Sequence, residues 1–275
     1  MARRPKSAVP EPAQPRVIAV ANQKGGVGKT TTVASLALLA SREGARVLAI
    51  DIDPQASLTI YFGEDPRALD DSGRTTYALI RGTADPNSLV LGDNPALVPA
   101  SIRLASAESE LVGEWNGATL LRDRLTAFAG RYDLILLDCS PSLGLLTVNA
   151  LAAADAVLVP VKTDYLSLMG VGLLLETVEK VRTRLNPGLE VMGVLPTMHD
   201  ARNSHDREAL EELGRLMQGR ARLYPPIRRS TAFDQASVAG LPGLLASGPS
   251  RALDAYRPLV QEILDHGRQA TEPQG

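Results

Sequence analysis

Short apolar runs alternate along the chain with longer segments in which apolar residues recur at helical spacing. Runs of about four to six aliphatic residues are typical of buried strands, whereas recurrence at every third or fourth position indicates an amphipathic helix. The runs predict strands at 17–21, 46–50, 96–100, 133–138, 156–161 and 190–195. The helical pattern covers 30–41, 76–81, 108–128, 167–185, 207–218 and 253–264. This alternation predicts an α/β fold with a mainly parallel, doubly wound sheet and helices on both faces.

The two ends of the chain lack this alternation. Residues 1–15 are basic and rich in proline, and the residues after 266 are polar. We therefore expect disordered tails at 1–15 and 267–275, with one domain over 16–266. Within that domain, residues 61–95 are polar and interrupted by glycine and proline, which favours loops around the one short helix.

Composition narrows the class of protein. The chain has 275 residues, 44% of them hydrophobic, which suits one large α/β domain or at most two small ones. A net charge of −2 means that any contact with nucleic acid needs a local basic patch. The single cysteine, Cys139, excludes an internal disulfide framework and is expected to pack in the core. No long apolar run or secretory segment is present, so we expect a cytoplasmic protein without stable membrane association.

A glycine-rich loop joins the first predicted strand to the first predicted helix. Gly25, Gly26 and Gly28 allow backbone amides to curl around an anion, and the start of the following helix favours negative charge there. Lys29 supplies a charge for the outer phosphates, and Thr30 supplies a hydroxyl for Mg²⁺. The predicted nucleotide-binding residues of the loop are Lys24, Gly25, Gly26, Val27, Gly28, Lys29, Thr30 and Thr31.

The loop departs from the general phosphate-loop pattern at its start. Gln23 stands where that pattern has its first glycine, and a second lysine, Lys24, directly precedes the paired glycines. A lysine at this position is close to the triphosphate but is not needed to cradle it. The sequence therefore points to a separate role for Lys24.

Three aspartates follow predicted strands whose carboxyl ends should meet at one edge of the sheet. Asp51 and Asp53 flank a core residue after the second strand, and Asp138 ends the strand at 133–138. Ligands of open parallel sheets bind at this edge, and an acid at the end of a buried strand can hold Mg²⁺ or its water. Asp53 with Pro54 could instead only begin a turn, but the neighbouring phosphate loop favours a site.

Five arginines lie close together in the sequence with no acid between the first and the last. They are Arg215, Arg220, Arg222, Arg228 and Arg229. A run of charge is usually a solvated face, but this one carries a single sign within a nearly neutral protein. We predict that these residues contact DNA.

Several segments together resemble one family of nucleotide hydrolases. The run from Lys24 to Thr31 is similar to the deviant Walker A motif shared by ParA/Soj, MinD and the nitrogenase iron protein. The segment Asp51–Gln55, with Thr59 beyond it, resembles the second motif of the ParA/Soj branch. The segments 133–144, 148–155 and 193–200 also fit that branch. The resemblance covers residues 16–264, outside the basic N-terminal tail.

This resemblance implies an ATPase, weak without its partner, that serves chromosome or plasmid partition. Two subunits would sandwich two ATP molecules, Lys24 would reach the partner's phosphates, and Asp53 would orient the attacking water. Thr30 would bind Mg²⁺ directly, with Asp51 and Asp138 acting through water. Thr197, Met198 and Arg229 would contact the nucleotide. The implied partners are a ParB-like centromere-binding protein and non-specific double-stranded DNA, which would make the protein nucleoid-associated.

The sequence departs from the family pattern at two residues, and two other functions remain as alternatives. Ser140 replaces a usual proline, and Arg228 stands where the family often has a proline near the adenine. A MinD-like membrane ATPase shares the first motif, but the C-terminal residues here have no apolar face. Nitrogenase-type reductases need cluster cysteines that this chain lacks. A DNA-bound regulator with little hydrolysis is the remaining alternative.

Overall fold

The computed structural model describes residues 13–233, 240 and 251–271. Its centre is a six-stranded sheet in the order β3-β2-β4-β1-β5-β6, and every strand pair is parallel. The strands are β1 (Arg16–Val20), β2 (Val47–Ile52), β3 (Ala96–Val98), β4 (Leu134–Cys139), β5 (Ala156–Lys162) and β6 (Glu190–Thr197). Their nearly continuous apolar sequence is buried on both faces, as parallel sheets require. The predicted fold class is confirmed.

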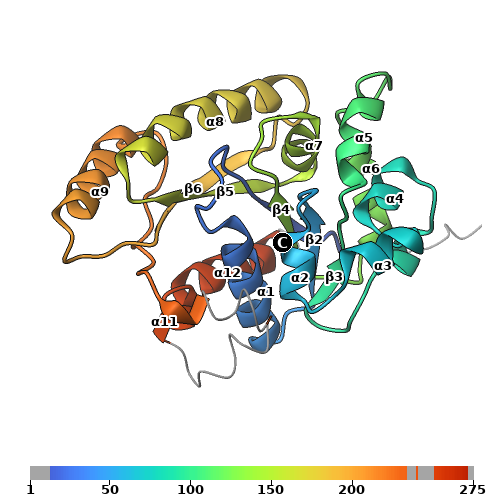
Figure 1. The fold of residues 1–275 in the computed structure, drawn as a ribbon, viewed down its shortest axis with the longest axis horizontal. Coiled ribbons are helices and arrows are strands. Elements are labelled where there is room, and N and C mark those ends of the chain that lie inside the picture. Colours follow the sequence, from blue (N-terminus) through green and yellow to red (C-terminus); the bar gives the residue numbers. More distant parts are fainter. Residues whose placement is uncertain (1–12, 234–239, 241–250, 272–275) are drawn as a thin grey trace, which may run out of the picture.

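Helices cover both faces of the sheet (Figure 1). One layer contains α4 (Thr76–Arg81), α5 (Leu104–Leu111), α6 (Leu120–Leu125), α7 (Leu145–Ala153), α8 (Tyr165–Arg184) and α9 (Ser204–Met217). The other contains α1 (Lys29–Arg42), α2 (Ser57–Tyr61), α11 (Arg251–Asp254) and α12 (Arg257–Thr271). The short helix α3 (Pro66–Asp71) and two 3₁₀ turns (Pro86–Leu89 and Thr126–Phe128) complete the described elements. Cys139 lies fully buried beneath the first layer.

The helix predicted at 108–128 is wrong as a single element. The chain forms α5 and α6 with an irregular segment at 112–119 between them. Gly117 lies in this segment, and the close approach of its backbone requires glycine, because a Cβ there would collide with the carbonyl oxygen of Leu111. Three further helices, α2, α3 and α7, were not predicted. The apolar residues of α7 leave no helical period to detect, since the helix is almost entirely buried.

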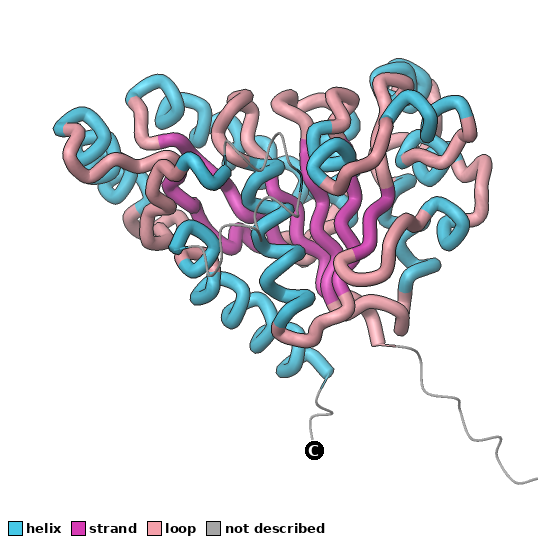
Figure 2. Tube along the Cα trace, turned by 60° about the horizontal axis from the view of Figure 1, so that its bottom comes forward, coloured by secondary structure: helices cyan, strands magenta, loops and turns pink. Residues whose placement is uncertain are grey.

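The predicted closing helix at 253–264 is divided into α11 and α12. Helix α12 continues to Thr271, so residues 267–271 of the predicted C-terminal tail are helical. The predicted N-terminal tail lies, as far as residue 12, outside the described residues, as do residues 272–275. Figure 2 shows that both ends of the described chain lie at the same edge of the sheet, opposite the carboxyl ends of the strands.

Candidate functional site

The glycine-rich loop connects β1 to α1 at the carboxyl edge of the sheet. Gly26 and Gly28 have φ angles of 69° and 83°, a left-handed conformation that glycine adopts without steric cost. The Lys29 ammonium is buried and donates a hydrogen bond to the carbonyl of Lys24 at 3.1 Å. Burial lowers the pKa of Lys29, and the carboxyl of Asp138 opposes this effect. The loop therefore combines the left-handed glycine backbone that suits an anion-binding turn with one buried cation.

Thr30 and Asp138 lie in contact at the base of this loop. The Thr30 hydroxyl donates to Oδ2 of Asp138 at 2.7 Å. The other oxygen, Oδ1, is buried without a hydrogen-bond partner among the described residues. Burial and the neighbouring Asp51 raise the pKa of Asp138 well above its ordinary value. A hydroxyl beside an unpartnered carboxylate oxygen fits the oxygen ligands that Mg²⁺ or its water shell prefers.

Asp51 lies opposite Asp138 on the adjacent strand, but its oxygens are engaged differently. Oδ1 accepts from the backbone N–H of Asp53 at 3.1 Å. Oδ2 accepts from both the N–H and the hydroxyl of Thr59, at 2.9 and 2.7 Å. Burial raises the pKa of Asp51 to about 7. The metal role of Asp51 stays a prediction. The hydrogen bonds that its carboxylate makes in the structure are with residues of the loop that follows it.

Asp53 follows β2 and is 9% exposed at the mouth of the site. Its Oδ1 accepts from the N–H of Gln55 at 2.9 Å, and burial raises the pKa of its carboxyl. Ala56, in the same loop, has a φ of 54°, a conformation that costs a non-glycine residue about 1–2 kcal/mol. Asp53 is thus a largely buried carboxyl next to the phosphate loop, on backbone held in a specific shape.

Lys24 contacts the first turn of α8 through its ammonium. Nζ lies 2.9 Å from Oδ1 of Asp164 and 2.9 Å from the hydroxyl of Ser167. Lys162 contacts the other oxygen of the same carboxylate at 3.1 Å. Burial opposes ionisation of Asp164, but hydrogen bonds from Ser167, Lys24 and Lys162 outweigh it and hold its pKa below the usual range.

Sequence reasoning missed Asp164 and Ser167. The Asp164 carboxylate also accepts from the N–H of Ser167 at 2.8 Å and so caps α8. An aspartate three residues before a serine at a predicted helix start is a capping signal. That signal locates the start of the helix, but it does not reveal that Lys24, far away in the sequence, binds there.

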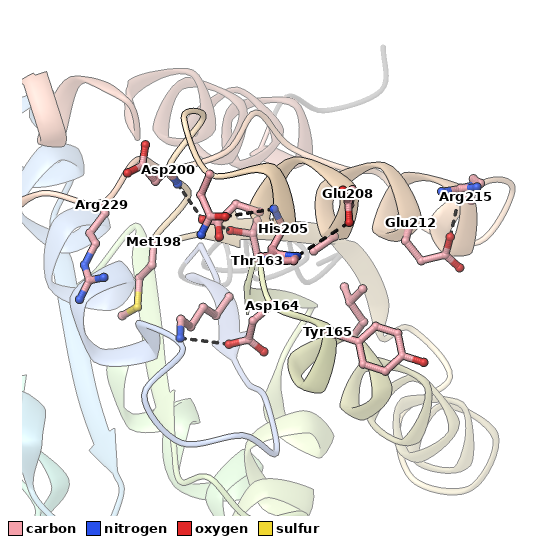
Figure 3. Close-up of a pocket in the computed structure, with 15 residues that line it drawn as sticks. Thr163, Asp164, Tyr165, Met198, Asp200, His205, Glu208, Glu212, Arg215 and Arg229 are labelled. Atoms are coloured by element: carbon pink, nitrogen blue, oxygen red, sulfur yellow. Dashed lines mark hydrogen bonds and ion pairs between the residues drawn. The ribbon is translucent and has the colours of Figure 1, made fainter.

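The residues predicted to contact the rest of the nucleotide lie at the end of β6. The Thr197 hydroxyl donates to the carbonyl of Val27 in the phosphate loop at 2.8 Å. Met198 has a φ of 54° and, with Arg229, lines a cavity of about 970 Å³ between the starts of α8 and α9. Figure 3 shows Met198 and Arg229 side by side at one end of this cavity and Asp164 and Tyr165 below it. Of the three residues, Thr197 contacts the phosphate loop directly, whereas Met198 and Arg229 line this cavity.

The arginine run does not form a surface of one sign. Arg215 pairs with Glu212 at 3.1 Å, and Arg222 pairs with Glu262 at 2.8 Å while stacking on the ring of Tyr224. These acids come from α9 and α12. The sequence prediction of a purely basic surface was therefore wrong for Arg215 and Arg222, because it considered only the acids within the run. Arg220, Arg228 and Arg229 are exposed, with no ion pair to any described residue. Only these three remain candidates for contacts that need free charge.

Comparison with known proteins identifies the family. A family model for an AAA domain matches residues 15–191. The chain is 38% identical to the sporulation initiation inhibitor protein Soj of Bacillus subtilis, over 92% of this chain and 99% of that protein. It is 39% identical to the chromosome partitioning protein ParA of Caulobacter vibrioides, over 92% and 95%. The chain belongs to the ParA/Soj family of partitioning ATPases. The predicted family and the predicted ATPase class are confirmed.

A solved structure of similar sequence resembles this ParA/Soj family member along nearly its whole length. It is a Mycobacterium smegmatis protein named cobyrinic acid a,c-diamide synthase, with 36% identity and a TM-score of 0.79 over 93% of this chain and 97% of that one. That structure contains an ATP analogue and magnesium, the two ligands that the sequence predicted here. Among the described helices of this chain, none is both long and apolar enough to cross a membrane.

Proposed function

We propose that this ParA/Soj family member is an ATP-dependent DNA-partitioning ATPase. ATP and Mg²⁺ bind at the carboxyl edge of the sheet, where Lys29 and the loop amides hold the phosphates. Thr30 and Asp138 would hold Mg²⁺, and that ion would supply positive charge against the phosphates. Asp53 orients the attacking water, and hydrolysis yields ADP and phosphate. The unpartnered Oδ1 of Asp138 and the buried Lys29 support this assignment.

The position of Lys24 carries the proposal that ATP closes a homodimer. Its ammonium is held by the first turn of α8, and the neighbouring residues of that helix expose large apolar side chains. Tyr165, Leu166 and Met169 are 73%, 74% and 69% exposed. A cation beside an apolar helix face is a surface that a second copy can cover, with the cation reaching the phosphates of the other subunit. Closure would replace the contact of Lys24 with Asp164 by one with phosphate.

Dimer closure would join the basic surfaces of two subunits into one DNA footprint. Each additional phosphate contact raises affinity and its salt dependence, so a dimer binds non-specific DNA far more strongly than a monomer. A ParB-like partner would stimulate hydrolysis, after which the dimer opens and leaves the nucleoid. A DNA-bound regulator would skip this release, and a MinD-like ATPase would bind lipid instead.

The decisive experiment measures binding to a non-specific duplex with ATP, with ADP and without nucleotide. We expect tight binding only with ATP, because only the triphosphate closes the dimer. Equal binding in all three conditions would support a nucleotide-independent regulator. No binding in any condition, with ATP turnover intact, would instead support a membrane ATPase or an enzyme acting on a small molecule.

Neutralising Arg220 and Arg228, which are exposed and form no ion pair with any described residue, should weaken DNA binding without affecting ATP turnover. With two arginines lost from each subunit, the slope of log affinity against log salt should fall by about 3 to 4. The matched control is Arg215→Gln with Arg222→Gln, which removes the same charge from arginines already paired with Glu212 and Glu262. We expect a clearly smaller change in the control. Equal salt slopes for both double variants would place the DNA surface elsewhere.

A further inference from the structure

Thr59 is a fully buried residue of α2 that makes three hydrogen bonds to two other parts of the chain. Its hydroxyl donates to Oδ2 of Asp51 at 2.7 Å and accepts from the N–H of Ala100 at 2.9 Å. Its own N–H donates to the same Asp51 oxygen at 2.9 Å. The hydroxyl therefore joins the end of β2, the start of α2 and the segment after β3 at one point.

These contacts bind both ends of the loop that carries Asp53 to one carboxylate, that of Asp51. The other oxygen of Asp51 accepts from the N–H of Asp53 at 3.1 Å, so both ends of the segment 53–59 are tied to Asp51. Within the loop, the N–H of Ala56 donates to the carbonyl of Asp53 at 2.8 Å. The carboxyl of Asp53 extends from this closed ring next to the phosphate loop.

A purely packing role does not account for this geometry. Thr59 is 0% exposed among apolar residues, where valine has nearly the same shape and would avoid burying a hydroxyl. The hydroxyl instead supplies a donor for Asp51 and an acceptor for Ala100. Without the Thr59 hydroxyl, the Asp51 carboxylate loses one of the three donors that fix its rotation. The N–H of Asp53, which donates to the same carboxylate, is then held less firmly.

We propose that Thr59 is a positioning residue for Asp53. Its hydroxyl fixes the Asp51 carboxylate, and that carboxylate fixes the backbone of Asp53. The side chain of Asp53 is thereby held where it can orient the attacking water. The consequence for turnover rests on the proposed role of Asp53, whereas the effect on the loop does not. Asp51 acts in this scheme as the anchor of the loop, beside Asp138 with its free oxygen.

The first test measures amide hydrogen exchange in the nucleotide-free protein. In Thr59→Val, the amides of Asp53 and Thr59 should exchange at least about tenfold faster, because their shared acceptor is no longer held. Thr59→Ser keeps the hydroxyl and should exchange like the wild type. Thr76→Val is the matched control, since it removes another buried threonine hydroxyl, which donates to the carbonyl of Pro99 at 3.0 Å and does not contact Asp51.

The second test separates kcat from KM for ATP. Misplacement of a reacting group lowers the rate of the chemical step, so kcat of Thr59→Val should fall about tenfold or more while KM stays within about threefold. Thr59→Ser should restore turnover, and Thr76→Val should leave it unchanged. If the valine variant does not fold, Thr59→Ala, which leaves space for water, is measured against the same expectations.

Three results would overturn the proposal: unchanged exchange in Thr59→Val, faster exchange with unchanged kcat, or an equal loss of kcat in Thr76→Val. The role of Asp53 within the proposed function fails through a different result, wild-type turnover in a variant without the Asp53 carboxyl. That result leaves the exchange measurement intact, so the two failures are distinguishable.

Discussion

Replacing Asp53 with alanine should lower ATP turnover by about 100-fold or more and leave the protein as an ATP-bound dimer on DNA. Loss of a group that orients or activates the attacking water typically costs a factor of 10² to 10⁴. The residues that we propose to hold the nucleotide and Mg²⁺ are untouched, because Lys29, Thr30 and Asp138 make none of their hydrogen bonds with the Asp53 side chain. Binding and closure therefore persist while release stops.

Phosphate release measures ATP turnover, and light scattering with ATP measures whether the dimer persists. Asp71→Ala is the matched control, since it removes an exposed carboxyl from the short helix α3. We expect wild-type turnover and DNA release in that variant. Wild-type turnover in Asp53→Ala would contradict the assignment of Asp53, and loss of ATP binding would show that its carboxyl serves the loop instead.

The placements that the sequence predicted correctly are those encoded by local patterns. Gly26 and Gly28 mark the loop because only glycine adopts their left-handed backbone cheaply. Asp51 and Asp138 end apolar runs, and parallel strands bring such ends to one edge, where the two residues lie directly opposite each other. In these cases the backbone itself places the side chain.

The parts that the sequence did not predict depend on contacts between distant segments. The Glu262 carboxylate neutralises Arg222 although 40 residues separate the two. The Asp164 carboxylate binds Lys24 across 140 residues, and Ala100 binds Thr59 across 41. Each depends on how helices and loops pack on the sheet, which no periodicity in a single sequence encodes. The split between α5 and α6 was not predicted either, because the close approach of Gly117 to the carbonyl of Leu111 is a feature of the folded segment.

Lys24 is the residue whose role changes most between one subunit and two. In the single chain it forms an ion pair with Asp164 and a hydrogen bond with the Ser167 hydroxyl. The side chains of Lys24 and Asp164 are 35% and 31% exposed. Exposed pairs of this kind contribute up to about 1 kcal/mol, so nothing in the stability of the monomer requires this lysine. Its position in the phosphate loop instead suits a cation that moves to phosphate when a second subunit arrives.

Lys24→Ala should therefore abolish ATP-dependent dimerisation while ATP still binds the monomer. Lys29 and the loop amides remain to hold the nucleotide, but the charge that crosses to the other subunit is lost. Removing one preorganised cation from a developing negative charge typically costs a factor of about 10² to 10³ in rate, so turnover should fall as well. Light scattering, nucleotide titration and phosphate release test the three expectations separately.

Lys162→Ala provides the matched control for this prediction. Lys162 contacts the same carboxylate, Oδ2 of Asp164 at 3.1 Å, but lies at the end of β5 outside the phosphate loop. If loss of a cation next to Asp164 were sufficient to disturb α8, both variants would fail to dimerise. We expect only Lys24→Ala to fail, with similar melting temperatures for the two. A normal ATP-dependent dimer in Lys24→Ala would refute the cross-subunit role, because the charge that defines it would be absent.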